Sequence, residues 1–272
     1  MQPLECILSI LYKMDEVNKK IGIVLCGGGV RGLSQIGILA ALEEHGIYPQ
    51  YISGSSVGAI IGAFYASGYS PKDMLEVSKK SKILKLFKPS FRKKGISNMK
   101  YLDRLLRKHL TTENFEQLEK KLYVCACNLY SGKAEIFSEG PLIKPVLASA
   151  AVPVVFQPQL INGQLYSDGG LLNVLPAEPI RDKCDKVLGV FVHNFYEIDE
   201  LKTWPAMFDR YLSLRLHDNA RERMKMCDLM IIPEKAFEYS FLRKKTDEQL
   251  YQIGYEKTLS LMPEIKNTLN LA

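Results

Sequence analysis

The sequence predicts an α/β protein in which helices cover both faces of a mainly parallel sheet. Short apolar runs of strand length alternate with longer runs of helical spacing, in the order strand, glycine loop, helix, strand, serine turn and helix over residues 21–67. Such a βαβα order makes neighbouring strands parallel and places a ligand site beyond their carboxyl ends. The length of 272 residues, of which 47% are apolar, suits one large domain or two small ones.

The first elements follow from local residue types. Residues 21–25 form a short apolar run rich in β-branched residues, which is typical of a buried strand. Apolar residues recur at helical spacing over 33–45, and Gly46 follows in the position where glycine commonly ends a helix. The run 51–53 predicts the second strand, and residues 57–67 predict the second helix.

The later elements continue the alternation. A small-residue helix that ends at Pro153 and a turn at 168–170 lie among runs of strand type. We expect strands at 122–128, 134–137, 160–166, 187–192 and 229–232, and helices at 145–151, 204–227 and 246–261. No repeat or linker interrupts them, so residues 21–272 are predicted to form a single domain after an N-terminal extension, 1–20.

The stretch 70–110 differs in composition from its surroundings. Between residues 72 and 108 it carries thirteen Lys or Arg and three acidic residues, interleaved with Leu, Ile and Phe. We expect helices joined by a loop near 88–95, which together form a helical basic cap inserted into the domain. Two interpretations stay open: a solvated flap, or a face that contacts an anionic membrane peripherally through residues 72–108.

Ser56 lies between two glycines where the second predicted strand turns into a helix. In a nucleophile elbow the turn is sharp and small residues must flank the serine, as Gly54 and Gly58 do here. The helix N-terminus behind the serine adds a positive dipole end and free N–H groups. Ser56 is therefore the candidate nucleophile, and an ordinary strand-to-helix turn is the alternative for so short a pattern.

A glycine-rich loop, Gly27-Gly28-Gly29-Val30-Arg31-Gly32, follows the first strand and opens a helix. Its backbone N–H groups can point into the crevice at the serine and hold an oxyanion, because no side chain blocks close approach at the three glycines. Arg31 either fixes the loop or attracts a phosphate-bearing substrate. The spacing also fits a dinucleotide fingerprint, but the serine turn stands where that fingerprint requires an acidic residue.

Two side chains are candidates for the base that activates the serine. Asp168 follows a strand in a turn with Gly169 and Gly170, and desolvation would raise its pKa enough for direct proton transfer. His193, also after a strand, completes the chain order Ser, Asp, His of common hydrolase triads. An ordinary Asp-Gly turn is the structural alternative for Asp168. The residues alone leave dyad and triad open.

Cysteine spacing and the start of the chain bear on the compartment. Cys125 and Cys127 are the only close pair among six cysteines, so no metal site is expected and the thiols are interpreted as buried and reduced. The run 6–11 is short and lacks a basic leader, and no apolar run reaches the roughly 18 residues of a membrane span. We expect a cytoplasmic protein, peripheral at the inner membrane face if it meets a membrane, that starts at Met1 or Met14.

Three motifs in order resemble the patatin-like phospholipase family: the glycine loop, the serine elbow and the turn Asp168-Gly169-Gly170. The run 148–153, Asn173 and Pro176 add to the resemblance, which extends from about residue 21 to 184. It implies a three-layer α/β/α domain that hydrolyses lipid acyl esters through a Ser56–Asp168 dyad, without a metal or cofactor. The implied oxyanion segment comprises Gly27, Gly28, Gly29, Arg31 and Gly32.

Two residues depart from the family pattern without removing a reacting group. Ser55 replaces a frequent threonine, and Val154, after Pro153, replaces a more usual glycine. The sequence thus predicts a carboxylic ester hydrolase with a lipid or acyl-ester substrate and no nucleic-acid partner, and it specifies no oligomeric state. The rival of a different class is a membrane-docking or regulatory protein on the same fold.

Overall fold

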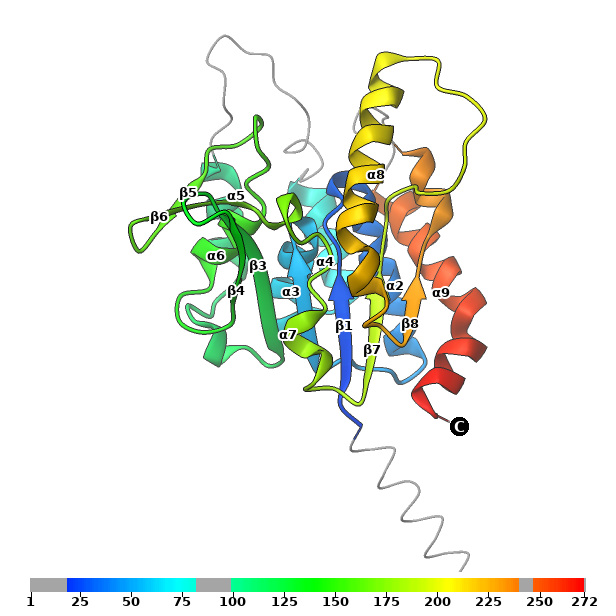
Figure 1. The fold of residues 1–272 in the computed structure, drawn as a ribbon. Helices are drawn as coiled ribbons and strands as arrows, with labels where there is room; N and C mark the ends of the chain where they lie inside the picture. The colour runs from blue at the N-terminus through cyan, green and yellow to red at the C-terminus, as the bar shows by residue number, and fades with distance from the viewer. Residues whose placement is uncertain (1–18, 82–98, 240–246, 272) are drawn as a thin grey trace, which may run out of the picture.

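The computed structural model describes residues 19–81, 99–239 and 247–271 (Figure 1). Its strands are β1 (Ile21–Leu25), β2 (Tyr51–Ser55), β3 (Lys121–Asn128), β4 (Lys133–Phe137), β5 (Gln159–Ile161), β6 (Gln164–Asp168), β7 (Lys186–Val190) and β8 (Leu229–Ile231). Its α-helices are α2 (Ser34–Glu44), α3 (Val57–Ala66), α4 (Pro71–Ser81), α5 (Lys100–His109), α6 (Ile143–Ser149), α7 (Glu178–Arg181), α8 (Trp204–Met224) and α9 (Asp247–Leu269). Short 3₁₀ helices are η1 (Gly29–Leu33), η3 (Phe115–Gln117), η4 (Gly169–Leu171) and η5 (Glu234–Glu238).

The sheet is parallel through its middle and antiparallel at one side. Its strand order is β5-β6-β3-β2-β1-β7-β8, with β4 also paired to β3. The neighbours β3, β2, β1, β7 and β8 pair in parallel, whereas β4, β5 and β6 pair antiparallel. The predicted α/β architecture with a mainly parallel sheet is confirmed, and the carboxyl ends of the parallel strands lie together at one end of the molecule.

Helices cover both faces of the sheet. On one face α3 contacts β1, β2 and β3, while α2 packs against α9 and α4. On the other face lie α7 and α8 (Figure 1). Ile180 of α7 and Cys184, which follows the helix, lie so close to Gly22 of β1 that a Cβ atom there would be 3.0 Å and 2.8 Å from them. Central strand residues such as Ile23 and Ile52 have no exposed surface. Burial on both faces explains why these strands are continuous apolar runs in the sequence.

One edge of β3 carries two strands end to end. β2 pairs in parallel with the first five residues of β3, and β6 pairs antiparallel with its last three. β4 occupies the opposite edge of β3, so β2 and β6 share the same one. Because they approach from opposite directions, their last residues, Ser55 and Asp168, pair with Cys125 and Ala126, which are adjacent in β3. The sheet therefore brings the end of β6 to the turn that follows β2.

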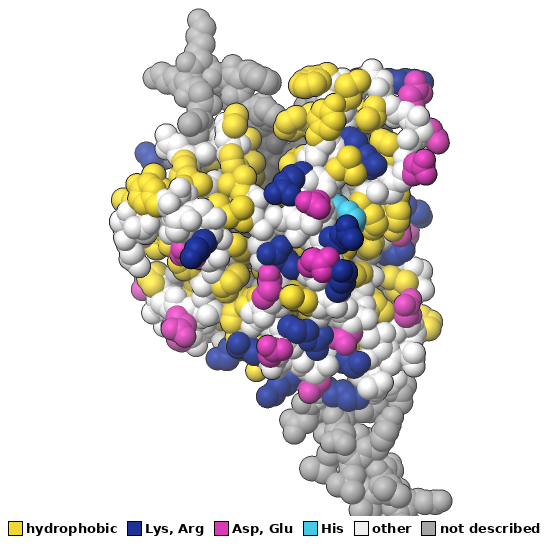
Figure 2. All heavy atoms as spheres, viewed as in Figure 1, with side chains coloured by type: hydrophobic (Ala, Val, Ile, Leu, Met, Phe, Trp, Pro, Cys, Tyr) yellow, Lys and Arg dark blue, Asp and Glu magenta, His cyan; other side chains and the backbone are white. Residues whose placement is uncertain are grey.

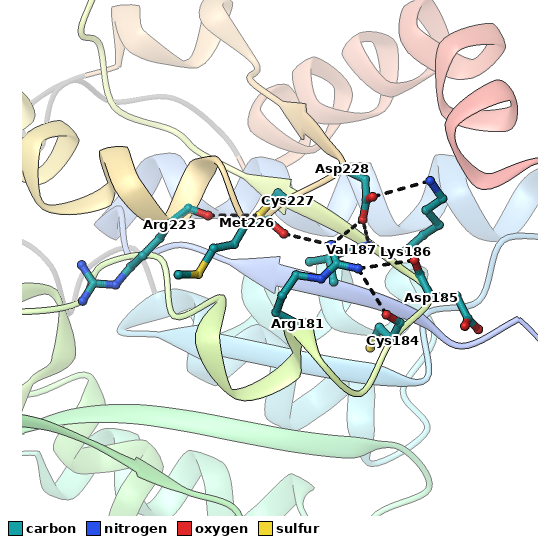
Figure 3. Close-up of polar contacts among 9 residues, drawn as sticks. All are labelled: Arg181, Cys184, Asp185, Lys186, Val187, Arg223, Met226, Cys227 and Asp228. Carbon is teal, nitrogen blue, oxygen red and sulfur yellow. Dashed lines mark hydrogen bonds and ion pairs between the residues drawn. The ribbon is translucent and has the colours of Figure 1, made fainter.

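A polar network closes the opposite end of the sheet, at the amino ends of β7 and β8 (Figure 3). Arg181 of α7 donates to Asp228 Oδ2 at 2.6 Å and to the Met226 carbonyl at 2.9 Å. The same carboxylate oxygen accepts the Val187 N–H at 2.7 Å, and Lys186 Nζ lies 3.5 Å from the other oxygen. These contacts join α7, β7 and the turn before β8 with charge-assisted hydrogen bonds.

The expectation of a single strand over 160–166 is wrong. This stretch is the hairpin of β5 and β6, which pair antiparallel. Its turn residues Asn162 and Gly163 have φ of 47° and 77°. Asn-Gly is the preferred dipeptide for a two-residue hairpin turn with both φ values positive. The signal for the hairpin was therefore present in the sequence, and it matters because this reversal directs β6 back along β3.

The last helix is longer than its sequence pattern predicts. The prediction of 246–261 ends before Pro263, but α9 continues through this proline to Leu269. Proline removes one backbone donor and normally breaks a helix interior. Here Met262, Ile265 and Leu269 are buried in the core, and burial of these apolar side chains outweighs the lost hydrogen bond.

Part of the predicted basic cap packs into the domain. Ser78 of α4 is buried and donates to Asp247 Oδ2 of α9 at 2.6 Å, and α5 packs on α6 through its buried leucines. Residues 82–98, which include the whole predicted loop near 88–95, lie outside the described residues, as do residues 1–18 of the predicted extension. The cap as a unit stays a prediction. Across the described ranges, no helix combines the length and apolarity that crossing a bilayer requires.

Candidate active site

Ser56 occupies a strained turn between β2 and α3. Its φ of 55° and ψ of −125° lie where non-glycine residues are rare. Only 5% of the residue is exposed, and its N–H donates to Ser149 Oγ of α6 at 2.8 Å. A serine on a sharp strand-to-helix turn is the geometry that a nucleophile elbow requires.

Gly54 and Gly58 allow this turn to be so tight. A Cβ atom at Gly58 would lie 2.1 Å from the Leu25 carbonyl oxygen, and one at Gly54 would lie 2.6 Å from the backbone of Gly58. No side chain fits at either position. The start of α3 therefore packs directly on the ends of β1 and β2, and Ser56 lies at the carboxyl ends of the parallel strands.

Asp168, the last residue of β6, contacts the serine directly. Ser56 Oγ donates to Asp168 Oδ2 at 2.5 Å, and the Gly170 N–H donates to Oδ1 at 2.8 Å. Burial raises the pKa of Asp168 to about 6, because desolvation disfavours the charged form and the two hydrogen bonds offset it only in part. A carboxylate with this pKa is ionised at pH 7 and still basic enough to accept a proton.

The two residues are 112 positions apart in the chain, and the pairing of β2 and β6 on one edge of β3 brings them together. Gly169 permits the close approach. A Cβ atom at Gly169 would lie 2.3 Å from the Cys125 carbonyl oxygen and 2.6 Å from Ser55 Oγ. The turn after β6 therefore lies directly against the end of β2.

The glycine loop lies beside the serine. A Cβ atom at Gly27 would be 3.2 Å from Ser56 Cβ. The Gly27 N–H is engaged, since it donates to the Val174 carbonyl at 3.0 Å. In contrast, the N–H groups of Gly28 and Gly29 donate to no acceptor within the part of the chain that the structure describes. The loop that begins beside Ser56 thus carries two N–H groups without a partner among the described residues, and the predicted contribution of Gly27 is not that of a free donor.

Groups of the protein hold the Arg31 guanidinium. Its Nη2 donates to Asp209 Oδ2 of α8 at 2.6 Å, and its Nε donates to the Tyr239 carbonyl at 2.8 Å. Of the two roles predicted for Arg31, these contacts support fixing the loop, because its charge is already paired. Gly32 lies against the elbow helix, where a Cβ atom would be 2.2 Å from Val57 Cγ1.

His193 contacts the glycine loop and neither reacting side chain. Its Nε2–H donates to the Gly27 carbonyl at 2.8 Å, and Nδ1 is buried without a partner among the described residues. Burial, together with the nearby Arg31 charge, lowers the pKa of His193 to about 4, so the ring is neutral at pH 7. The Ser, Asp, His order in the chain is therefore not matched by a hydrogen-bonded triad in this structure.

Sequence reasoning did not single out two residues that position the site. Ser149 Oγ accepts the Ser56 N–H. The Ala151 carbonyl accepts both the Asp168 N–H at 3.0 Å and the Ser167 hydroxyl at 2.7 Å. Both belong to the run 148–153, which the sequence indicated as part of a small-residue helix and of the family resemblance without a role in positioning the site. Small side chains let α6 and its following loop approach the two reacting residues.

Val154 has a backbone conformation that favours glycine. Its φ is 69°, in the left-handed region where a β-branched residue is strained. The side chain is 90% exposed, so no packing offsets this strain. Val154 lies only three residues beyond Ala151, in the loop that leads away from the site.

The five cysteines of the described residues do not gather as metal ligands would. Cys26, Cys125, Cys127 and Cys184 are buried and free, and Cys227 is partly buried and free. Burial raises the pKa of Cys26 to about 12, so this thiol is protonated at pH 7. Within residues 19–81, 99–239 and 247–271, no three His, Cys, Asp or Glu side chains gather as metal ligands would.

Comparison with protein families gives one match that covers more than half of the chain. A family model described as patatin-like phospholipase matches residues 23–181, a range that includes Ser56, Asp168 and the whole glycine loop. The solved structure of VipD from Legionella pneumophila has a TM-score of 0.54 at 15% identity and covers 90% of this chain and 67% of that one. At this identity the likeness concerns the fold.

Relatives with a higher identity match only part of their own length. An uncharacterized NTE family protein of Mycobacterium tuberculosis is 34% identical over 60% of this chain and 46% of that protein. Lysophospholipase NTE1 of Phaeosphaeria nodorum is 29% identical over 92% of this chain and 19% of that protein. The chain therefore spans less than half the length of these two relatives.

Proposed function

This chain belongs to the patatin-like phospholipase family, and we propose that it is a serine hydrolase that cleaves acyl esters of lipids. One observation carries the proposal: the 2.5 Å hydrogen bond from Ser56 Oγ to the buried Asp168 carboxylate, beside the unpaired N–H groups of the glycine loop. A nucleophile, a base and oxyanion donors are the three components that acyl transfer requires.

In the acylation step, Ser56 Oγ attacks the ester carbonyl carbon while its proton passes to Asp168 Oδ2. The carbonyl oxygen becomes an oxyanion that the N–H groups of Gly28 and Gly29 stabilise. When the tetrahedral intermediate collapses, the bond to the alcohol breaks and Asp168 returns the proton to the leaving oxygen. The products are an acyl-serine and the free alcohol, such as a lysophospholipid or a glycerol derivative.

In the deacylation step, Asp168 accepts a proton from a water molecule that attacks the acyl-serine. The same N–H groups hold the second oxyanion. Collapse then breaks the bond to Ser56 Oγ, which regains its proton from Asp168, and the fatty acid leaves. A carboxylate with a pKa of about 6 can both accept the proton and return it in each step, because its pKa is close to neutral pH.

We infer the lipid class of the substrate from the family and from the named relatives of this chain. The family is named for phospholipases, and the relative from Phaeosphaeria nodorum is a lysophospholipase. We therefore assign esters with a fatty acyl chain as the substrate class of this chain, and the cytoplasmic location remains a prediction from sequence.

A fluorophosphonate probe tests the nucleophile. We expect the probe to label the wild-type protein and not Ser56→Ala, because only an activated serine reacts with it. Ser55→Ala is the matched control, since the Ser55 hydroxyl is buried next to Ser56 and has no partner in the described residues. Equal labelling of Ser56→Ala and wild type would refute the assignment.

Ester turnover by His193→Ala separates dyad from triad. The bond from His193 to Gly27 favours the dyad, so we expect the variant to retain most of the activity. A loss of several orders of magnitude in kcat, with the fold intact by circular dichroism, would instead indicate a triad base.

The rival class is a membrane-docking or regulatory protein on the same fold. It predicts no turnover of any ester in a broad panel, together with liposome binding that high salt weakens. In that case, neutralising Arg92, Lys93 and Lys94, which lie outside the described residues, would reduce binding to anionic vesicles. The intact Ser56–Asp168 contact favours the enzyme.

A further inference from the structure

The outward side of α8 carries an unusual set of exposed aromatic residues near its N-terminus. Trp204, Phe208 and Tyr211 are 70%, 56% and 59% exposed, and Leu214 is 42% exposed. Spacings of four and three residues place the three aromatic side chains on one face of the helix. Figure 2 shows hydrophobic side chains gathered over the upper end of α8, which projects beyond the carboxyl ends of the strands in Figure 1. We call these four residues the aromatic face.

Other residues of the same helix contact the candidate active site. Asp209, next to Phe208, is bonded to Arg31 of the glycine loop at 2.6 Å. Further along, the Asn219 side chain accepts the Val174 N–H at 2.9 Å, and Val174 in turn holds Gly27. One helix thus joins the aromatic face to the loop beside Ser56.

Exposed apolar residues also follow the two segments that meet at Asp168. Val154 follows the loop residue Ala151, whose carbonyl accepts the Asp168 N–H, and Leu171 lies three residues after Asp168. Both side chains are exposed. Scattered exposed apolar residues are ordinary, whereas groups that adjoin a functional site mark an interaction surface.

We propose that the aromatic face docks on the surface of a phospholipid bilayer and presents the active site to lipid held there, an inference that rests on the proposed function. Trp and Tyr favour the bilayer interface, because the ring is apolar and one end forms hydrogen bonds with water. Around the face, Lys202 pairs with Glu200, Arg215 pairs with Asp218 and Arg210 donates to the Asn194 carbonyl at 3.2 Å, so these described residues form no cluster of free basic side chains. Docking is therefore driven by apolar burial and does not require anionic lipid.

Trp204 is the only tryptophan in the chain, so its fluorescence reports on this surface without a label. We expect unilamellar vesicles of pure phosphatidylcholine to shift its emission to shorter wavelength, and we expect the shift to persist at high salt. The Ser56→Ala variant should show the same shift, because docking does not depend on catalysis. No shift with these vesicles would overturn the proposal.

The double variant Phe208→Asp/Tyr211→Asp keeps Trp204 as the reporter and places charge in the aromatic face. Both side chains are exposed, so the fold should be preserved, which circular dichroism checks. We expect vesicle affinity to fall at least about a hundredfold, about tenfold for each aromatic side chain removed from the interface. Tyr48→Asp is the matched control: Tyr48 is 52% exposed and precedes β2, at the opposite end of the sheet. Unchanged binding by the double variant would refute the assignment.

Two substrates distinguish failure of docking from failure of the proposed function. The double variant should lose turnover of phosphatidylcholine in vesicles and retain turnover of a water-soluble short-chain ester, which reaches Ser56 without a bilayer. If the wild type cleaves neither substrate but its Trp204 emission still shifts with vesicles, the proposed function fails and docking stands. A shift that instead depends on protein concentration without lipid, with a doubled mass in solution, assigns the face to a second copy of the chain and overturns the proposal.

Discussion

Asp168 and Asp228 lie at opposite ends of one sheet, and their pKa values shift in opposite directions. Burial raises the pKa of Asp168 to about 6, and no cation pairs with it in the described residues. Desolvation also acts on Asp228, but the hydrogen bonds from Arg181 and the Val187 N–H, with the charges of Arg181 and Lys186, hold its pKa below the ordinary value. The same side chain is thus kept reactive at one end and fully paired at the other.

The contrast extends to the backbone and the neighbouring polar groups. At the carboxyl ends of the strands, Ser56 has a positive φ, and Ser55 Oγ and His193 Nδ1 are buried without partners among the described residues. At the amino ends, both oxygens of Asp228 are engaged. Backbone strain and unpaired polar groups thus occur at the carboxyl ends of the strands, where chemistry is proposed. The fully paired groups at the amino ends of the strands contribute to stability.

Asp168→Asn should have the largest effect of the variants considered, because it should abolish most activity and at the same time raise stability. An amide cannot accept the serine proton, so we expect kcat to fall by about a thousandfold or more. The raised pKa means that ionised Asp168 destabilises the folded state above about pH 6. The variant should therefore gain roughly 1–3 kcal/mol in free energy of unfolding at pH 7. Denaturant titration at pH 7 measures this gain, and a clear loss of stability would contradict the comparison.

The pH profile of kcat/KM should report the same carboxylate. The base must be deprotonated, so activity is expected to fall about tenfold per pH unit below about 6 and to be level above it. The His193 ring, whose pKa is lowered to about 4, should add no step near neutral pH. Steady-state kinetics with a soluble ester provide the profile. An ascending limb centred well above 6 that vanishes in His193→Ala would instead identify histidine as the base.

Asp228→Asn is the matched change at the amino ends of the strands, and it should lower stability without affecting activity. It weakens the charge-assisted bonds to Arg181 and Lys186, so we expect a loss of about 2 kcal/mol in free energy of unfolding. Asp228 has a lowered pKa, so this contribution is present at neutral pH and is lost as pH falls through the folded-state value. Ester turnover should not change. A strong loss of turnover with unchanged stability would show that the two ends are not functionally distinct.

Val154→Gly should give the smallest effect, a gain in stability at the reactive end. Glycine adopts the φ of 69° without strain, and relief of that strain exceeds the entropy lost by glycine, leaving a gain of about 0.5–1 kcal/mol. A shift of the thermal midpoint measures it. Val154→Ala is the control, since alanine keeps the Cβ atom that causes the strain, and an equal gain from alanine would remove this explanation.

Local residue types predicted the parallel core well. β1, β2, α2 and α3 lie within two residues of the predicted ranges, because apolar runs and glycine breaks report local conformation directly. The β5–β6 hairpin was missed although Asn162-Gly163 marks it, and the end of α9 was misjudged at Pro263. Local sequence could not predict that α9 continues past Pro263, because this depends on the burial of residues on both sides of the proline in the folded core.

The sequence could not predict where the site side chains point or which groups they bond. The order of Ser56, Asp168 and His193 in the chain suits a triad, yet the His193 ring bonds the Gly27 carbonyl. Arg31 was open between two roles until its bonds to Asp209 and the Tyr239 carbonyl were known. These partners lie about 170 to 210 positions away in the chain, and no local pattern specifies contacts of that range.

The sequence by itself determined the fold class, the family and the residues with the right chemistry, because each of these follows from local spacing and residue type. The tertiary structure alone decided which of those residues meet. Ser56 and Asp168 touch because the antiparallel return of β6 along β3 ends where β2 ends, and the helix that carries the aromatic face is joined to the glycine loop through the Asp209–Arg31 ion pair. Pairing between distant strands depends on the whole sheet, and it is this pairing that makes two separated motifs into one site.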